Sequence, residues 1–216
     1  MKLFPWECWE PSAPEDFMRD DPDEANHPSR IRMCNEAAMV GGKILEIGCG
    51  TAIDYPRLTR MGLKYSAVEL TPKFIARARE LHPGIDIRQG RIWDLPFEDD
   101  SFDVVYCRGV VQHLPPETYP EALDEMWRVA KTLLLVSTNR LFRKGKGITY
   151  REKGGPYVNH YVFDEFNGYI KTLPGSISRY VSGFMRPEER ERNLRLNISH
   201  TIFIVYDADY WRANLQ

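Results

Sequence analysis

Short apolar runs alternate with amphipathic segments through the middle of the chain. The runs predict strands, and several are continuous in hydrophobicity, as expected for strands buried on both faces of a parallel sheet. Most segments between them carry one apolar stripe and predict helices. The predicted strands are 43–47, 64–70, 84–89, 102–107 and 133–137, and the predicted helices are 29–39, 54–61, 71–81 and 116–130. This alternation predicts an α/β fold with a doubly wound, mostly parallel sheet.

The two ends of the chain follow other patterns. Residues 1–25 are rich in proline and acidic side chains, which predicts an irregular N-terminal arm ahead of a single domain at 26–216. Near the other end, 140–156 is basic and glycine-rich and predicts a loop. The remaining predicted elements are a helix capped by Asp164 and running to Leu173, strands at 178–185 and 201–208, and a charged loop at 186–197 between those strands.

Two closely spaced glycines, Gly48 and Gly50, follow the first predicted strand. Glycine tolerates backbone angles and close approaches that other residues do not, so such a turn can present N–H groups to a ligand at the carboxyl edge of the sheet. A dinucleotide fingerprint needs a further glycine where this chain has Ile53. Glu69 ends the second strand and is placed to accept hydrogen bonds from both ribose hydroxyls of a nucleoside. Dinucleotide-binding folds share this acid, so the residues alone leave the identity of the nucleoside open.

Several blocks of the sequence resemble one known family in order. Residues 46–51, Glu-Ile-Gly-Cys-Gly-Thr, look like motif I of the class I S-adenosylmethionine (SAM) dependent methyltransferases, and 67–70 look like the acidic end of their second strand. Residues 89–97 with 100–105 resemble the third and fourth blocks, and 110–114 the segment after strand four. The closest subgroup is the small "type 11" methyltransferases. The resemblance implies a Rossmann-like, seven-stranded doubly wound sheet, mostly parallel with an antiparallel C-terminal strand.

The resemblance also implies how the methionine and ribose parts of SAM are held. Gly48 and Gly50 would let the turn approach the methionine end. Glu46 would engage the methionine amino group, directly or through water; alternatively it is a buried carboxylate that accepts N–H groups of the loop. Glu69 would bind the ribose and is the strongest single assignment.

The adenine side is expected to follow the third strand. Arg91 stands where the family often has an acid near the adenine amino group, and arginine cannot accept that hydrogen bond. Adenine recognition is therefore expected at backbone groups around Ile92, with Leu70 or Trp93 beside the ring. The alternative for Trp93 is an aromatic side chain that only packs at the surface.

The resemblance places the methyl acceptor near the end of the fourth strand. Cys107 would lie beside the transferred methyl as a small wall residue rather than a nucleophile, because nothing nearby in sequence lowers its pKa. His113 is the candidate general base for an oxygen or nitrogen acceptor, and its alternative is a structural hydrogen bond. Tyr157, His160 and Tyr161 lie where the family often builds substrate pockets, and His160 is interpreted as structural.

The implied protein is an enzyme, a transferase that moves the methyl group of SAM to an O, N or C atom of a small molecule and leaves S-adenosylhomocysteine (SAH). One alternative is an RNA or protein methyltransferase, since the segment 140–153 holds a basic cluster. A non-catalytic SAM-binding module and an NAD-dependent oxidoreductase are the others, and Ile53 speaks against NAD.

Composition narrows the class of partner. The net charge of −2, with 43% hydrophobic and 28% charged residues, is that of a soluble globular protein without global attraction to nucleic acid or membranes. No apolar run reaches the roughly 18 residues that span a bilayer. The four cysteines form no C-x-x-C pair, so we expect neither a metal site nor a disulfide framework, and we expect a cytoplasmic location.

Overall fold

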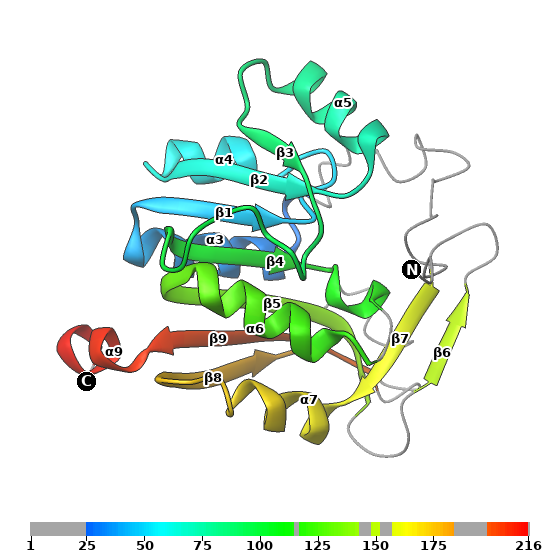
Figure 1. Ribbon diagram of the computed structural model, residues 1–216, viewed down its shortest axis with the longest axis vertical. Coiled ribbons are helices and arrows are strands. Elements are labelled where there is room, and N and C mark those ends of the chain that lie inside the picture. The colour runs from blue at the N-terminus through cyan, green and yellow to red at the C-terminus, as the bar shows by residue number, and fades with distance from the viewer. Residues whose placement is uncertain (1–24, 115–116, 143–147, 152–156, 184–197, 216) are drawn as a thin grey trace.

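The computed structural model describes residues 25–114, 117–142, 148–151, 157–183 and 198–215 (Figure 1). The predicted arm at 1–25 lies almost entirely outside the described residues. The same holds for the predicted loop at 186–197 and for most of the basic cluster at 140–153.

Seven strands form the main sheet in the order β3-β2-β1-β4-β5-β9-β8. The pairs among the first five are all parallel, whereas β9 runs antiparallel to both of its neighbours. The predicted fold class is confirmed, including the antiparallel strand at the C-terminal end. The strands are β1 (Lys43–Ile47), β2 (Lys64–Glu69), β3 (Ile87–Gln89), β4 (Phe102–Arg108), β5 (Ala130–Phe142), β8 (Ser176–Ser182) and β9 (Ile198–Asp207).

An additional hairpin extends the sheet beyond the end of β4. β5 continues past β4 and pairs in parallel with β7 (Tyr157–Val162), which pairs antiparallel with β6 (Ile148–Arg151). The prediction of a loop throughout 140–156 was wrong, because β5 reaches Phe142 and β6 lies within this range. The end of β5 is stabilised by pairing with β7 and β9, and β6 by pairing with β7, and local composition does not reveal these pairings.

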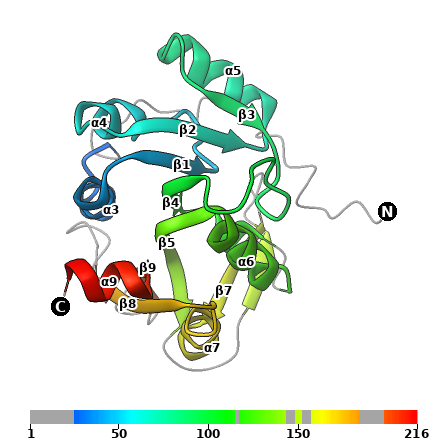
Figure 2. The same cartoon turned by 60° about the vertical axis from the view of Figure 1, so that its left-hand side comes forward.

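Helices cover both faces of the sheet (Figures 1 and 2). Residues of α3, α4, α5 and α9 belong to the core on one face, and residues of α6 and α7 to the core on the other. The helices are α3 (Pro28–Val40), α4 (Tyr55–Arg60), α5 (Pro72–Leu81), α6 (Tyr119–Val129), α7 (Phe163–Ile170), α9 (Ala208–Asn214) and a short 3₁₀ helix, η2 (Val111–His113). None of these helices is both long enough and apolar enough to cross a bilayer.

Several element boundaries differ from those predicted by one to a few residues, those of β3, α6, α7, β8 and β9 among them. β3 begins at Ile87 rather than at 84, and α7 has Val162 at its N-cap and ends at Ile170. Asp164 therefore lies in the first turn of α7 and does not cap it. Backbone hydrogen bonding sets these limits, and side-chain character predicts them only to within a few residues.

The order of strands places a crevice at the carboxyl edge of the sheet. From β1 the chain moves outward to β2 and β3, then returns to the other side of β1 through β4. Connections leave in opposite directions at β1 and β4, and such a switch point is where open α/β sheets bind ligands. Gly48, Glu69 and His113 all follow or end strands at this edge.

Candidate active site

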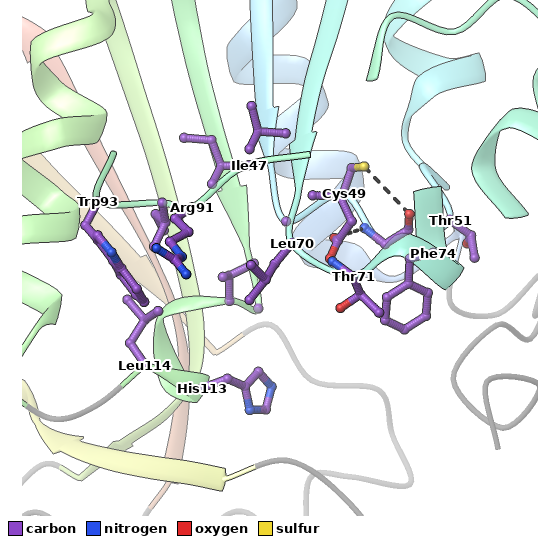
Figure 3. Close-up of a pocket in the computed structure, with 18 of the residues that line it drawn as sticks. Ile47, Cys49, Thr51, Leu70, Thr71, Phe74, Arg91, Trp93, His113 and Leu114 are labelled. Carbon is purple, nitrogen blue, oxygen red and sulfur yellow. Dashed lines mark hydrogen bonds between the residues drawn. The ribbon is translucent and has the colours of Figure 1, made fainter. Parts of the chain in front are cut away.

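A cavity of about 300 Å³ opens at this edge, beyond the ends of β1, β2 and β4 (Figure 3). Figure 3 shows Trp93 and Arg91 on one side, Thr71 and Phe74 on the other, and His113 with Leu114 at the bottom of the view. The cavity is lined by residues 47–51, 53, 68–71, 74, 90–93, 109, 110, 113 and 114. Seven of the nine predicted site residues line it: Gly48, Gly50, Glu69, Leu70, Ile92, Trp93 and His113.

The glycine loop has the backbone that its sequence predicts. Gly48 and Gly50 have φ angles of 66° and 58°, in the left-handed region that favours glycine. The Gly48 N–H donates to the carbonyl of Val68 at 2.8 Å, which ties the loop to β2. A Cβ on Gly48 would lie 2.3 Å from Cγ2 of Val110, so only glycine fits at this position. Ala52 has a φ of 58° and continues the left-handed pattern without a glycine.

Glu69 lies where the second strand meets the glycine loop. Its Oε2 accepts the Gly50 N–H and its Oε1 accepts the Thr71 N–H, both at 2.9 Å. The side chain is only 7% exposed and lines the cavity. Burial raises the pKa of this carboxyl, and the backbone hydrogen bonds from Thr71 and Gly50 oppose that rise. Glu69 therefore links the loop to the start of α5 and presents a carboxylate at the cavity wall.

Glu46 does not line the cavity. It is 3% exposed, and its Oε2 accepts a 2.5 Å hydrogen bond from the hydroxyl of Tyr65. Burial, followed by the nearby charge of Asp54, raises the pKa of Glu46 well above its usual range. Alternate residues of a strand face opposite sides of the sheet, so Glu46 points to the face covered by α3. The prediction that it engages a methionine amino group stays a prediction; of the alternative role, the structure shows the burial, with the Tyr65 hydroxyl as hydrogen-bond donor.

The raised pKa of Glu46 predicts a pH-dependent stability. A carboxyl with a higher pKa in the folded than in the unfolded state loses stabilising effect as pH rises, here from the ordinary value of 4.5 upward through the raised pKa. Glu46→Gln keeps an oxygen for Tyr65 and removes the titration. We expect the variant to gain at least about 1 kcal/mol of unfolding free energy over the wild type at alkaline pH, because one pKa unit corresponds to 1.36 kcal/mol.

Denaturant titrations across the pH range measure this difference. The exposed Glu98→Gln is the matched control and should show no growing advantage with pH. An advantage of Glu46→Gln that is equal at all pH values would mean that Glu46 has the same pKa in the folded and unfolded states, which would contradict the raised pKa.

The segment after β3 forms the wall opposite α5. Ile92 is buried and Trp93 is partly buried against the core under α6. Arg128 of α6 holds this segment through hydrogen bonds to the carbonyls of Leu95 and Phe97, and Glu125 accepts the Leu95 N–H at 2.8 Å. These contacts fix the path of the chain just after Trp93, so its side chain lines the cavity and also packs on the core.

The side of the cavity predicted to hold the methyl acceptor is formed by the chain after β4. His113 is half-buried at the end of η2 and lines the cavity, and its Nε2 lies 3.5 Å from Nε2 of Gln112. Cys107 is fully buried in the core under α6 and does not line the cavity, which the chain reaches two residues later at Gly109. Burial raises the pKa of this thiol, so it stays protonated at neutral pH.

Three residues of β7 were also candidates: Tyr157, His160 and Tyr161. His160 and Tyr161 are buried, and neither lines the cavity, while the side chain of Tyr157 lies outside the described residues. Tyr161 contacts the site indirectly, because its hydroxyl donates to the carbonyl of Val111 in η2 at 2.8 Å.

Several residues that line the cavity are not among the predicted site residues. Thr71 and Phe74 belong to the predicted helix 71–81, and Val110 to the segment after strand four. Their nearness to Glu69 and His113 in sequence was the available signal. Within the described residues, no group of three or more His, Cys, Asp or Glu side chains is arranged to hold a metal ion.

Residues 45–133 match the family model described as a methyltransferase domain. A probable phthiotriol/phenolphthiotriol dimycocerosates methyltransferase 2 of Mycobacterium ulcerans is 37% identical over 116 residues, which are 52% of this chain and 44% of that protein. Over these residues the chain is similar to methyltransferases. A ubiquinone biosynthesis O-methyltransferase of Xylella fastidiosa is 27% identical to this chain over 194 residues, 87% of this chain and 71% of that protein.

The first relatives are longer than the part that this chain matches. The match spans 44% of the Mycobacterium protein and 56% of a ubiquinone biosynthesis O-methyltransferase of Xanthomonas campestris. Among solved structures, the Burkholderia thailandensis 1,6-didemethyltoxoflavin-N1-methyltransferase, bound to 1,6-didemethyltoxoflavin and SAH, superposes with a TM-score of 0.67 at 15% identity, covering 91% of this chain and 84% of its own. A putative SAM-dependent methyltransferase of Listeria monocytogenes gives 0.68 at 11% identity, covering 87% and 99%. At these identities the likeness shows the fold.

Proposed function

We propose that this protein transfers the methyl group of SAM to an O, N or C atom of a small molecule. The observation that carries the proposal is the convergence of the glycine loop and the Glu69 carboxylate on one cavity at the switch point of the sheet. The family match supports the same reaction class.

The residues of the cavity fit this cofactor. The left-handed backbone at Gly48 and Gly50 leaves room for a ligand against the loop, and Glu69 supplies the acceptor that a ribose diol requires. Leu70, Phe74 and Ile92 offer apolar surface for a flat base. SAM, when bound, supplies a sulfonium-activated methyl group, so the protein has mainly to hold the acceptor in line and exclude water.

The acceptor is proposed to be a small molecule. The names of the relatives refer to a ubiquinone biosynthesis O-methyltransferase, a dimycocerosate methyltransferase and a toxoflavin N1-methyltransferase. His113 is proposed as the base for an acceptor that must lose a proton, because it lines the cavity where the chain leaves β4.

The proposed domain organisation is one unit from residue 26 onward. Glu36 of α3 supports it, since its carboxylate accepts hydrogen bonds from Arg179 of β8 and Tyr206 of β9 at about 3 Å. The proposed location is the cytoplasm, and its support is that Cys34, Cys49 and Cys107, the cysteines of the described residues, are all free thiols.

Calorimetry tests the reaction class. We expect micromolar binding of SAH and no binding of NADH, because the cavity offers a ribose ligand without the third glycine of a dinucleotide site. Binding of NADH alone would overturn the proposal.

A screen of small hydroxyl, amine and carbon acceptors then follows with the wild type and His113→Ala. Lost turnover with intact SAH binding would support the base. Unchanged turnover would return His113 to a structural role.

A further inference from the structure

We propose that Asn159 and Tyr161 of β7 are positioning residues that hold the acceptor-side wall of the cavity. Neither residue lines the cavity, and both direct their polar atoms at η2, the three-residue helix that carries His113. This inference rests on the proposed function in one respect: it takes that wall to be the one that faces the methyl acceptor.

The helix η2 is too short to fix its own position. It spans only Val111–His113, a single 3₁₀ turn in which the His113 N–H donates to the Val110 carbonyl and the Leu114 N–H donates to the Val111 carbonyl. Its carbonyls lie against β7 within the protein, where further donors are needed to replace water. Its position therefore depends on donors from elsewhere in the fold.

Two side chains of β7 supply those donors. The Asn159 amide donates to the carbonyls of Gln112 and Leu114, and the Tyr161 hydroxyl donates to those of Val111 at 2.8 Å and Leu114 at 3.4 Å. Asn159 is 1% exposed, so its amide is shielded from water. An apolar residue would fill the same space without directing hydrogen bonds, so the two polar groups specify where η2 lies.

Asn159 and Tyr161, which together form a clamp on η2, are themselves held in place. Tyr161 pairs with Leu141 in the extension of β5, so β7 is part of the sheet. The Tyr161 ring packs on Tyr119 of α6, with centroids 4.9 Å apart, and on Phe166 of α7 at 5.5 Å. The chain of contacts thus runs from the sheet through β7 to η2, and from η2 to the cavity wall at Val110, His113 and Leu114.

The position of the β6–β7 hairpin separates the clamp from the predicted cofactor residues. In the chain the hairpin lies between β5 and α7, apart from the glycine loop and Glu69. The hydrogen bonds of Asn159 and Tyr161 to η2 reach the site on the His113 side. We therefore expect changes in the clamp to alter the acceptor wall and to leave cofactor affinity nearly intact.

Nuclear magnetic resonance of the histidine rings in the full-length protein tests this inference. The His113 signals are assigned by their loss in His113→Gln, and His27 and His82 serve as internal references. Tyr161→Phe keeps the ring packing and removes only the hydroxyl. We expect it to shift the His113 signals, while SAH affinity by calorimetry stays within about threefold, since a tenfold change would need 1.4 kcal/mol.

The matched control is Tyr169→Phe. This tyrosine belongs to the same aromatic cluster through Tyr119, and its hydroxyl donates to Asp124 at the surface rather than to η2. Tyr169→Phe should lose about as much stability as Tyr161→Phe and leave the His113 signals in place. Asn159→Leu is the second clamp variant and should move His113 further, because the carbonyls of Gln112 and Leu114 both lose the Asn159 amide, and only that of Leu114 still accepts the Tyr161 hydroxyl.

His113 signals that are unmoved in Tyr161→Phe, or moved equally in Tyr169→Phe, would overturn the clamp. A tenfold or greater loss of SAH affinity in Tyr161→Phe would overturn it as well, since the hairpin would then support the cofactor half. Failure of the wild type to bind SAH would refute the proposed function alone, because the response of His113 to the clamp variants is measured without any ligand.

Discussion

Gly48→Ala is expected to abolish useful cofactor binding, with a loss of SAH affinity of roughly a hundredfold or more, equivalent to about 2.7 kcal/mol. The new Cβ would lie 2.3 Å from Cγ2 and 3.2 Å from Cγ1 of Val110, a stiff β-branched neighbour. The φ of 66° adds about 1–2 kcal/mol of strain for any L side chain. The loop must therefore move, and its N–H groups move with it away from the cavity.

Calorimetry with SAH measures the loss of affinity, and thermal unfolding measures any general loss of stability. Together they show whether the affinity falls because the loop has moved or because the protein is less stable. Gly62→Ala is the matched control, because Gly62 also has a positive φ of 89° but would place its Cβ in open space, outside the cavity. It should lower the melting temperature and leave SAH affinity unchanged. The double variant Gly48→Ala, Val110→Ala should recover part of the lost affinity. Full affinity in the single variant would show that the loop does not contact the cofactor.

Glu69→Ala is expected to weaken SAH binding by at least tenfold. The carboxylate would give charge-assisted hydrogen bonds to the ribose, each worth about 1.5–3 kcal/mol. It also holds the Gly50 and Thr71 N–H groups, so its removal loosens the loop as well. Because the pKa of Glu69 is raised, SAH affinity should begin to fall on acidification at a higher pH than for an ordinary glutamate.

A double-mutant cycle separates the ribose contact from the loop contact. Wild type and Glu69→Ala are each titrated with SAH and with its 2′-deoxyribose analogue. The wild type should discriminate strongly between the two ligands, and the variant should hardly discriminate at all. If both proteins discriminate equally between SAH and its 2′-deoxyribose analogue, Glu69 does not bind the ribose and only orders the loop. Glu80→Ala, an exposed acid on α5, is the control.

Local sequence signals predicted which residues at the ends of β1, β2 and β3 line the cavity. The glycine pair, the acid at the end of β2 and the residues after β3 each follow a strand directly, and parallel strands in one sheet bring their carboxyl ends to one edge. A residue just past such a strand therefore reaches the site almost regardless of distant packing. Gly48, Glu69 and Trp93 all line the cavity for this reason.

Residues inside strands were harder to place. Glu46 and Cys107 lie within β1 and β4, where successive side chains point to opposite faces of the sheet. Motif resemblance put both near the cofactor, but the pleat directs Glu46 toward Tyr65 and the α3 side, and Cys107 into the core under α6. Which face each helix covers is a property of the whole sheet, so no local pattern reports it.

The sequence by itself determined the doubly wound sheet, the position of the glycine turn and the acid that faces the cavity, because these depend on hydrophobic runs and on backbone angles that only glycine adopts readily. Only the tertiary structure decided that β5 extends past β4, that β7 pairs with this extension, and that Asn159 and Tyr161 thereby hold the η2 wall. These last contacts join residues more than forty positions apart. Such pairings become favourable only when the rest of the sheet has brought the partners together.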